Sequence, residues 1–241
     1  HLLAHAWALS RDFERIIETR SRTDVSPLGA GALAGSSLPI DPLMTSESLG
    51  FSETFKNSLD AVSDRDFVAE AIFVNALLGV HLSRIGEELV LWSSEEFEFV
   101  DIDDEYTTGS SMLPQKKNPD VAELARAKTG RIIGNLTGFL TVLKGLPLTY
   151  NKDLQEDKEP LFDSFDTNSL VLTALTGIFN SISFNEEKMS AAADKPFSMA
   201  IDLAEYLVHK GMPFREAHAL IGGLVKTSID DKKDFKNLVL E

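Results

Sequence analysis

The sequence predicts an all-α fold, in which an elongated bundle of long helices is followed by a small C-terminal helical unit. Three patterns lead to this prediction. Apolar residues recur every three to four positions in three long runs, which is the spacing of a buried helix face. No convincing alternating strand pattern is present. After Asn185 the helical runs become short, as in a smaller, separate unit.

The first part of the chain contains two helical runs with an irregular connection between them. Residues 2–19 place five apolar residues on one face: Leu2, Ala6, Leu9, Phe13 and Ile17. Residues 24–52 are rich in Pro, Gly and Ser and predict an ordered connection with short helical turns. The run over 63–94 then predicts a helix about 45 Å long.

Two further long runs, 119–145 and 155–183, complete the predicted bundle. The expected buried side of the first is marked by Val121, Ala125, Ile132, Leu136, Phe139 and Leu143. On another side, Gly130, Gly134 and Gly138 recur every fourth residue. Glycine costs up to about 1 kcal/mol per helix position, so this column indicates close helix–helix approach. The apolar faces are wider than one small bundle needs, and we expect them to pack against other copies of the chain.

The C-terminal part predicts shorter helices over 185–193, 199–210 and 213–227. We therefore expect two domains. Residues 1–190 would form a central helical-bundle domain and residues 191–241 a small C-terminal helical domain, each of them incomplete.

The composition excludes several classes of protein. The 241 residues carry a formal net charge of −15, which argues against nucleic acid or a membrane surface as a partner. No stretch approaches the roughly 20 apolar residues of a membrane span. The absence of cysteine excludes a disulfide framework and fits a cytoplasmic protein. The apolar opening HLLAHAWAL lacks a basic leader and a cleavage site, so we expect no signal peptide. The chain begins at His1 inside a helical pattern, so we expect a truncated start.

Residues 107–120, TTGSSMLPQKKNPD, combine small hydroxyl residues, two prolines and two lysines directly before a helical run. A flexible linker would not lead straight into an apolar-periodic helix. A nucleotide phosphate loop would need a G-x-x-x-x-G-K-[ST] pattern after a strand, and that pattern is absent. A helix N-terminus fits, with Asn118 as the cap, Pro119 in the first turn and Glu123 near the positive helix end. That interpretation is compatible with a functional role.

The segment GSSMLPQKKN resembles the G-S-S-x-M-P-x-K-x-N signature of the fumarase/aspartase superfamily. The methionine position of that signature holds Leu113 here, and Met112 precedes it. Other segments are similar to one branch, the argininosuccinate lyase and delta-crystallin family. These are PLGAGALAGSSLPID (27–41), NSLDAVSDRDF (57–67), LKGLPLTYNKDLQEDKE (143–159) and DLAEYLVHKGMPFREAH (202–218). The resemblance covers nearly the whole chain.

The resemblance implies a lyase that carries out the reversible β-elimination of argininosuccinate to arginine and fumarate, in arginine biosynthesis, as a homotetramer. It implies that Ser110 is the general base. Lys116 and Asn118 would hold the substrate carboxylate and stabilise the carbanion that forms there. Glu123 would pair with a histidine in a segment before residue 1. Because that segment is absent, we expect the 241-residue chain alone to be inactive.

The same resemblance assigns substrate binding to five residues: Arg65, Ser111, Tyr150, Gln155 and Lys158. For Lys117, a solvated or intersubunit charge is the expectation. The five histidines are His1, His5, His81, His209 and His218, and none matches the catalytic position, so each is expected to pack or lie on the surface. No group of His, Asp and Glu shows metal-ligand spacing, and no cofactor motif is present. We expect neither a metal nor a cofactor.

Two alternatives stay open. The chain could be a non-catalytic structural relative of the delta-crystallin kind, or another lyase of the superfamily such as adenylosuccinate lyase. For any lyase of this superfamily, we expect Ser110 and Lys116 to lie far from Tyr150 within one chain. They flank a long helix whose ends are about 40 Å apart. They would then meet Tyr150 or Arg65 only across an interface between chains.

Overall fold

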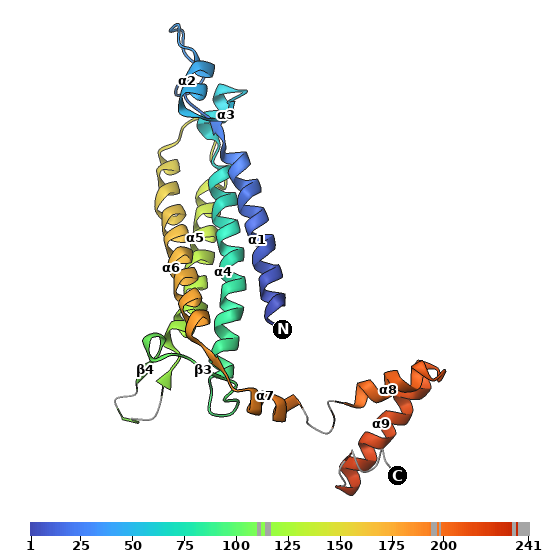
Figure 1. The fold of residues 1–241 in the computed structure, drawn as a ribbon. Coiled ribbons are helices and arrows are strands. Elements are labelled where there is room, and N and C mark those ends of the chain that lie inside the picture. Colours follow the sequence, from blue (N-terminus) through green and yellow to red (C-terminus); the bar gives the residue numbers. More distant parts are fainter. Residues whose placement is uncertain (110–111, 114–116, 194–196, 198, 233–234, 236–241) are drawn as a thin grey trace. The chain divides into compact units, whose positions relative to one another are not determined.

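The computed structural model describes residues 1–109, 112–113, 117–193, 197, 199–232 and 235. It divides into two compact units. The first comprises residues 1–94 and 102–182, and the second comprises residues 95–101 and 183–241. Helices dominate both (Figure 1). The division into domains at residue 190 stays a prediction.

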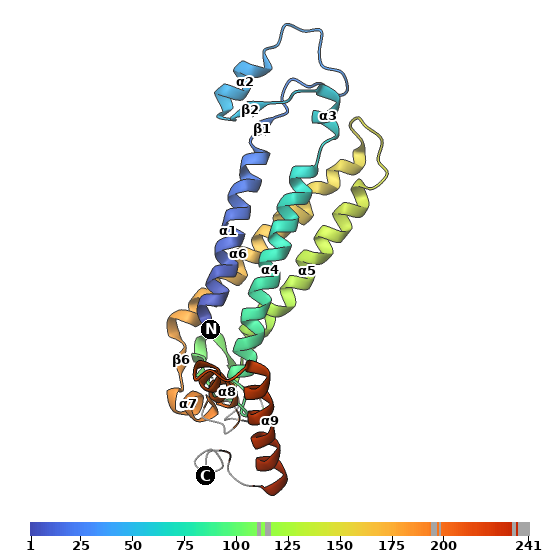
Figure 2. The same cartoon turned by 90° about the vertical axis from the view of Figure 1, so that its right-hand side faces the viewer.

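Four long helices run side by side in the first unit (Figures 1 and 2). They are α1 (Leu2–Thr23), α4 (Asp66–Trp92), α5 (Asp120–Leu143) and α6 (Lys158–Ser181). The last three lie within the predicted runs. Helix α4 is the centre, because it contacts α1, α5 and α6. Its buried apolar residues include Ile72, Leu82 and Leu89, each at most 1% exposed.

Helix α4 corrects one expectation from the sequence. It is long and apolar enough to cross a membrane, with a mean hydropathy of 1.4 over its most apolar window, although no such stretch was expected. However, 56% of that window is buried inside the bundle. A helix surrounded by three others must be apolar on most of its sides, so a central position in a helical bundle accounts for this composition.

Small residues of α4 allow α5 to approach closely. A Cβ atom on Gly86 would lie only 2.6 Å from the carbonyl oxygen of Ala122, and one on Gly79 would touch Thr129 and Ile132. Thr129 also donates a hydrogen bond from Oγ1 to the Gly79 carbonyl at 2.7 Å. The close approach expected of glycines therefore occurs in α4.

The predicted glycine column of α5 faces open space within this chain. No atom lies within 4 Å of the Cβ position of Gly130, Gly134 or Gly138. The predicted apolar face of α1 is also largely uncovered, since Phe13 is 66% and Ile17 48% exposed. The side of α1 that is buried instead consists of Ala8, Asp12 and Thr19.

Short elements close one end of the bundle, between α1 and α4. Strands β1 (Val25–Ser26) and β2 (Glu53–Thr54) pair in parallel, with Val25 opposite Glu53. Helix α2 (Pro42–Leu49) is capped by Asp41, and α3 (Ser58–Ser63) by Asn57. The predicted connection over 24–52 thus contains a short helix, as expected. It also contains the two residues of strand β1, which are too few to produce an alternating pattern.

Further short elements lie near the other ends of α4, α5 and α6. The 3-10 helix η1 (Asp104–Tyr106) precedes β4 (Thr108–Gly109), which pairs antiparallel with β5 (Lys117–Asn118). At the first end, beside α3 and the start of α4, the 3-10 helix η2 (Lys152–Asp157) connects α5 to α6. Tyr106 occupies the space where a side chain at Gly177 of α6 would lie.

The second unit has its own small core. Strand β3 (Val100–Asp101) pairs antiparallel with β6 (Ser183–Phe184), followed by α7 (Glu186–Ala193). Helices α8 (Ala200–His209) and α9 (Phe214–Asp231) pack together. The buried residues between them are Ala204, Ala217, Ile221 and Phe235. All three short helices lie close to their predicted ranges.

Candidate active site

The predicted site residues fall into two groups at opposite ends of α5. Asn118 and Glu123 lie at its start. Tyr150 and Gln155 lie in the connection that follows its end, and Lys158 is the first residue of α6. Figures 1 and 2 show this connection at the end of the bundle opposite the start of α5. The 24 residues of α5 separate the two groups by about 36 Å at 1.5 Å per residue. No single chain can therefore bring both groups to one small substrate.

The start of α5 is held by the β4–β5 pair. Gly109 lies opposite Lys117, and Thr108 lies opposite Asn118, so both ends of the segment 110–116 are fixed. The predicted residues Ser110, Ser111 and Lys116 belong to that segment and lie outside the described residues.

Asn118 has a different local role from the one expected. It belongs to β5, and Pro119 takes the N-cap position of α5 without a side-chain cap hydrogen bond. The carbonyl oxygen of Pro119 accepts a hydrogen bond from the Glu123 amide at 3.0 Å. The amide side chain of Asn118 is thus not used for capping. Glu123 is exposed and lies in the first turn, as predicted.

Lys117 forms an ion pair within its own chain. Its Nζ atom lies 2.6 Å from Oδ1 of Asp104, which is 83% exposed. The sequence alone left its partner open between solvent and another subunit. A pair this exposed contributes about 0–1 kcal/mol to stability, so its role in holding the hairpin is small.

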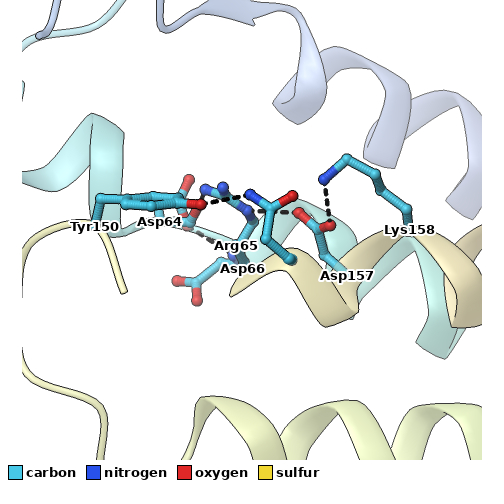
Figure 3. A network of polar contacts seen from close by, with 7 residues as sticks. Asp64, Arg65, Asp66, Tyr150, Asp157 and Lys158 are labelled. Carbon is cyan, nitrogen blue, oxygen red and sulfur yellow. Dashed lines mark hydrogen bonds and ion pairs between the residues drawn. The ribbon is translucent and has the colours of Figure 1, made fainter. Parts of the chain in front are cut away.

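At the other end of α5, Arg65 and Lys158 meet at one carboxylate (Figure 3). Arg65 donates from Nε to Oδ2 of Asp157 at 2.7 Å, and Lys158 donates from Nζ to Oδ1 at 2.8 Å. Arg65 also donates from Nη1 to the carbonyl oxygen of Asp64 at 2.6 Å. Asp157 is 6% exposed and was not predicted as a site residue. It fixes the directions of both cations.

Tyr150 and Gln155 form a second contact at this end. Gln155 donates from Nε2 to the phenol oxygen of Tyr150 at 2.5 Å. Tyr150 is 41% exposed, so its hydroxyl remains reachable from solvent. The structure therefore brings together four of the five predicted substrate-binding residues: Arg65, Tyr150, Gln155 and Lys158.

Two carboxyl pKa values in this cluster shift in opposite directions, one through its hydrogen-bonded cations and one through burial. Burial acts to raise the pKa of Asp157, but the hydrogen bonds and positive charges of Lys158 and Arg65 outweigh it, and the pKa lies below its ordinary value of 3.8. Burial raises the pKa of Asp64, aided by the negative charges of Asp66 and Asp60 and opposed by the Asp66 amide. Asp157 thus stays ionised as the partner of both cations.

A pocket adjoins the cluster. It has a volume of about 560 Å³, and both Arg65 and Asp157 lie in its wall. Its other charged lining residues are Arg22, Glu53, Lys56, Asp60 and Asp64. Paired donors and acceptors of this kind suit a small zwitterionic ligand, because guanidinium and ammonium groups bind carboxylates and carboxylates bind cationic groups.

Three histidines of the first unit form contacts between helices. His81 of α4 lies with Nδ1 2.5 Å from Oδ2 of the buried Asp12 of α1. His1 and His5 each place Nε2 2.8 Å from Oε2 of Glu88. Within the described residues, folding therefore brings together a His, His and Glu group that spacing in the sequence did not indicate. His1 and His5 are four positions apart and share a helix face. The packing of α4 against α1 places the carboxylate of Glu88, 83 positions after His5, beside them.

Comparison with known proteins gives the family. Residues 1–134 match the family model described as Lyase, and residues 197–241 match the model described as Argininosuccinate lyase C-terminal. The argininosuccinate lyase of Frankia casuarinae is 61% identical over 234 residues, which make up 97% of this chain and 50% of that protein. That of Carboxydothermus hydrogenoformans is 55% identical over 252 residues, which cover 100% of this chain and 55% of that protein. The chain spans about half the length of the curated relatives it matches.

Solved structures share the fold. The crystal structure of EDDS lyase in complex with formate has a TM-score of 0.84 at 33% identity and covers 96% of this chain and 46% of that one. A variant of EDDS lyase with bound fumarate gives the same values. Class II fumarase from Schistosoma mansoni has a TM-score of 0.81 at 16% identity, over 99% of this chain and 53% of that one, which shows the fold alone. The predicted all-α, fumarase-like fold is confirmed.

Proposed function

Given that this chain belongs to the lyase family, we propose that it forms part of an argininosuccinate lyase, which splits argininosuccinate into arginine and fumarate. The match of residues 197–241 to an argininosuccinate lyase model and the similarity to curated argininosuccinate lyases support this choice of substrate. A small substrate of this kind carries carboxylates at one end and a guanidinium-derived group at the other. No resident metal or redox cofactor enters this reaction scheme.

The chemistry is assigned by the signature over residues 109–118. Ser110 removes a proton from the succinyl carbon next to a carboxylate. The electron pair left on carbon forms the double bond of fumarate as the carbon–nitrogen bond breaks, and the departing nitrogen keeps its electrons and takes up a proton. Lys116 and Asn118 stabilise the extra charge on the carboxylate, a contribution of typically about 10²–10³ in rate for each donor. Ser111 assists in binding, and Glu123 orients the acid partner.

Substrate binding is assigned to the cluster around Asp157. Arg65 and Lys158 provide cationic donors, and Tyr150 and Gln155 provide neutral hydrogen-bonding groups. The observation that supports this role is the shared carboxylate, which holds the two cations 2.7 and 2.8 Å from its oxygens. Cations fixed in advance lose little side-chain entropy when a substrate binds. The fumarate bound to a variant of EDDS lyase agrees with a dicarboxylate product in this fold.

The active enzyme is proposed to be a homotetramer in the cytoplasm, with each active site assembled from more than one chain. The separation of the two groups by α5 carries this part of the proposal. Uncovered apolar side chains supply the surface for assembly, among them Trp7 (68% exposed), Phe13 (66%) and Phe162 (59%). Sedimentation at micromolar concentration tests it: a stable monomer that is active would exclude a shared site.

A substrate comparison tests the proposed activity. A polypeptide of the relatives' full length that contains this sequence is assayed with argininosuccinate, adenylosuccinate and malate, and fumarate is followed by absorbance. Argininosuccinate is expected to give the highest kcat/KM. Faster turnover of either other compound would assign the protein to a different lyase, and turnover of none would favour a non-catalytic relative.

A further inference from the structure

A group of three side chains outside the candidate active site has the donor set of a metal centre. His1 and His5 lie at the start of α1, and Glu88 lies in the last two turns of α4. One ligand atom from each of the three lies within 4.8 Å of the other two. Both imidazole Nε2 atoms are 2.8 Å from the same carboxylate oxygen, Oε2 of Glu88.

The backbone explains why these atoms converge. Residues four apart lie on the same face of an α-helix, so His1 and His5 both point toward one neighbouring helix. Helix α4 packs against α1 and presents Glu88 to that face. The ring of His1 also rests edge-on against Trp92, with 5.3 Å between ring centroids. The aromatic contact limits the directions available to the His1 ring.

We propose that His1, His5 and Glu88 bind one divalent transition-metal ion, with Zn²⁺ as the best fit, and that this ion links α1 to α4. Two imidazole nitrogens and one carboxylate oxygen are a known donor set for Zn²⁺, which leaves a fourth position for water. Mg²⁺ and Ca²⁺ prefer sites made of oxygen atoms, and a site with two nitrogens selects against them.

Access and charge are compatible with this assignment. The His1 side chain is 62% exposed, so an ion can enter from solvent, whereas those of His5 and Glu88 are 17% and 28% exposed and hold the ligands in place. The negative end of α4 lies beside His1, through Trp92, and favours a cation there. The carboxylate and the net charge of −15 then favour binding.

The test uses the full chain without a polyhistidine tag, stripped with EDTA and titrated with Zn²⁺ by calorimetry. The variants are His1→Ala, His5→Ala and Glu88→Gln, and the control is His209→Ala, which removes an exposed histidine of α8. We expect one ion per chain, at least about tenfold weaker binding in each of the three variants, and unchanged binding in the control. No saturable binding, or binding that Glu88→Gln leaves unchanged, would overturn the proposal.

A second measurement needs no variant and therefore does not depend on how the variants fold. Diethyl pyrocarbonate modifies accessible imidazoles, and mass spectrometry locates the modified residues. Saturating Zn²⁺ is expected to slow modification of His1 and His5 and to leave that of His209 unchanged. Equal rates at His1 and His5 with and without Zn²⁺ would contradict the site.

Discussion

Arg65 and Asp157 are 92 positions apart in the sequence, yet Arg65 Nε donates to Asp157 Oδ2 at 2.7 Å. The contact joins the start of α4 to the turn before α6. Because Lys158 donates to the other oxygen of the same carboxylate, one buried acid orders two cations. This arrangement places Asp157 at the centre of the proposed substrate-binding end.

The first prediction concerns the stability of this cluster. Asp157→Ala leaves Arg65, whose side chain is 17% exposed, without its carboxylate partner. We expect the free energy of unfolding to fall by about 1–3 kcal/mol, measured by urea denaturation. Asp153→Ala removes an exposed acid of the same 3-10 helix and is the matched control, expected to change little. Equal decreases in the free energy of unfolding for the two substitutions would show that the Arg65–Asp157 ion pair makes no specific contribution to stability.

The second prediction is a difference in pH dependence between two acids. The pKa of Asp157 is lowered in the folded chain, so its ionised form stabilises the fold above its unfolded pKa of 3.8, and that contribution is lost as the pH falls through the lower folded value. The pKa of Asp64 is raised, so ionisation costs stability at neutral pH and the cost disappears as the pH falls.

Substitution by asparagine separates these contributions. At neutral pH, Asp157→Asn is expected to be less stable than the parent chain, and Asp64→Asn is expected to be equally or more stable. Both differences should shrink in acid, where the parent carboxyls become protonated. Denaturation curves between pH 7 and the lowest pH at which the chain stays folded check this. A stabilising Asp157→Asn at neutral pH would contradict the lowered pKa.

The third prediction concerns the packing of α4 on α5. A methyl group at Gly86 would lie 2.6 Å from the Ala122 carbonyl oxygen, so Gly86→Ala must force the two helices apart. We expect a loss of about 1–3 kcal/mol of stability. The matched control, Gly223→Ala, changes a glycine of α9 whose Cβ position is open and should gain up to about 1 kcal/mol from helix propensity. A neutral Gly86→Ala would mean that the helices can separate at no cost.

The fourth prediction concerns substrate binding. Tyr150→Phe removes the hydroxyl that accepts from Gln155 while keeping the ring. In the full-length enzyme we expect kcat/KM for argininosuccinate to fall. The decrease should correspond to a loss of about 1–3 kcal/mol of transition-state stabilisation, as for a lost polar contact. Tyr206→Phe, in α8, is the control and should leave turnover unchanged. If the Tyr150→Phe enzyme keeps the full kcat/KM, the hydroxyl of Tyr150 does not take part in substrate binding.

The long helices could be predicted because their cores produce a repeating apolar pattern. The run over 119–145 contains α5 (Asp120–Leu143), and Ala125, Ile132 and Phe139 of its predicted side are buried. The pattern could not say which apolar side another helix of the same chain would cover. In α1 that side carries Asp12, which faces His81, whereas Phe13 stays exposed.

The candidate site was only partly predictable for a similar reason. A family signature assigns residues that touch a substrate, and it identified Arg65 and Lys158. It did not identify Asp157, because within QEDKE this acid looks like any charged residue of a solvated turn. Its burial depends on Arg65, far away in the sequence. The meeting of His5 with Glu88 depends in the same way on the packing of α1 against α4.

The central claim is that each active site uses Asn118 from one chain and Lys158 from another, and mixing two inactive chains tests it most directly. Full-length Asn118→Ala and Lys158→Ala chains are each expected to have little activity. Assembled together in equal amounts, they should give about one quarter of the parent activity, because one site in four receives both intact residues. A mixture of Asn118→Ala with Glu123→Gln, which alters the same end of α5 in both chains, should recover none. If the Asn118→Ala and Lys158→Ala mixture also recovers no activity, the two residues act within a single chain and the shared site is wrong.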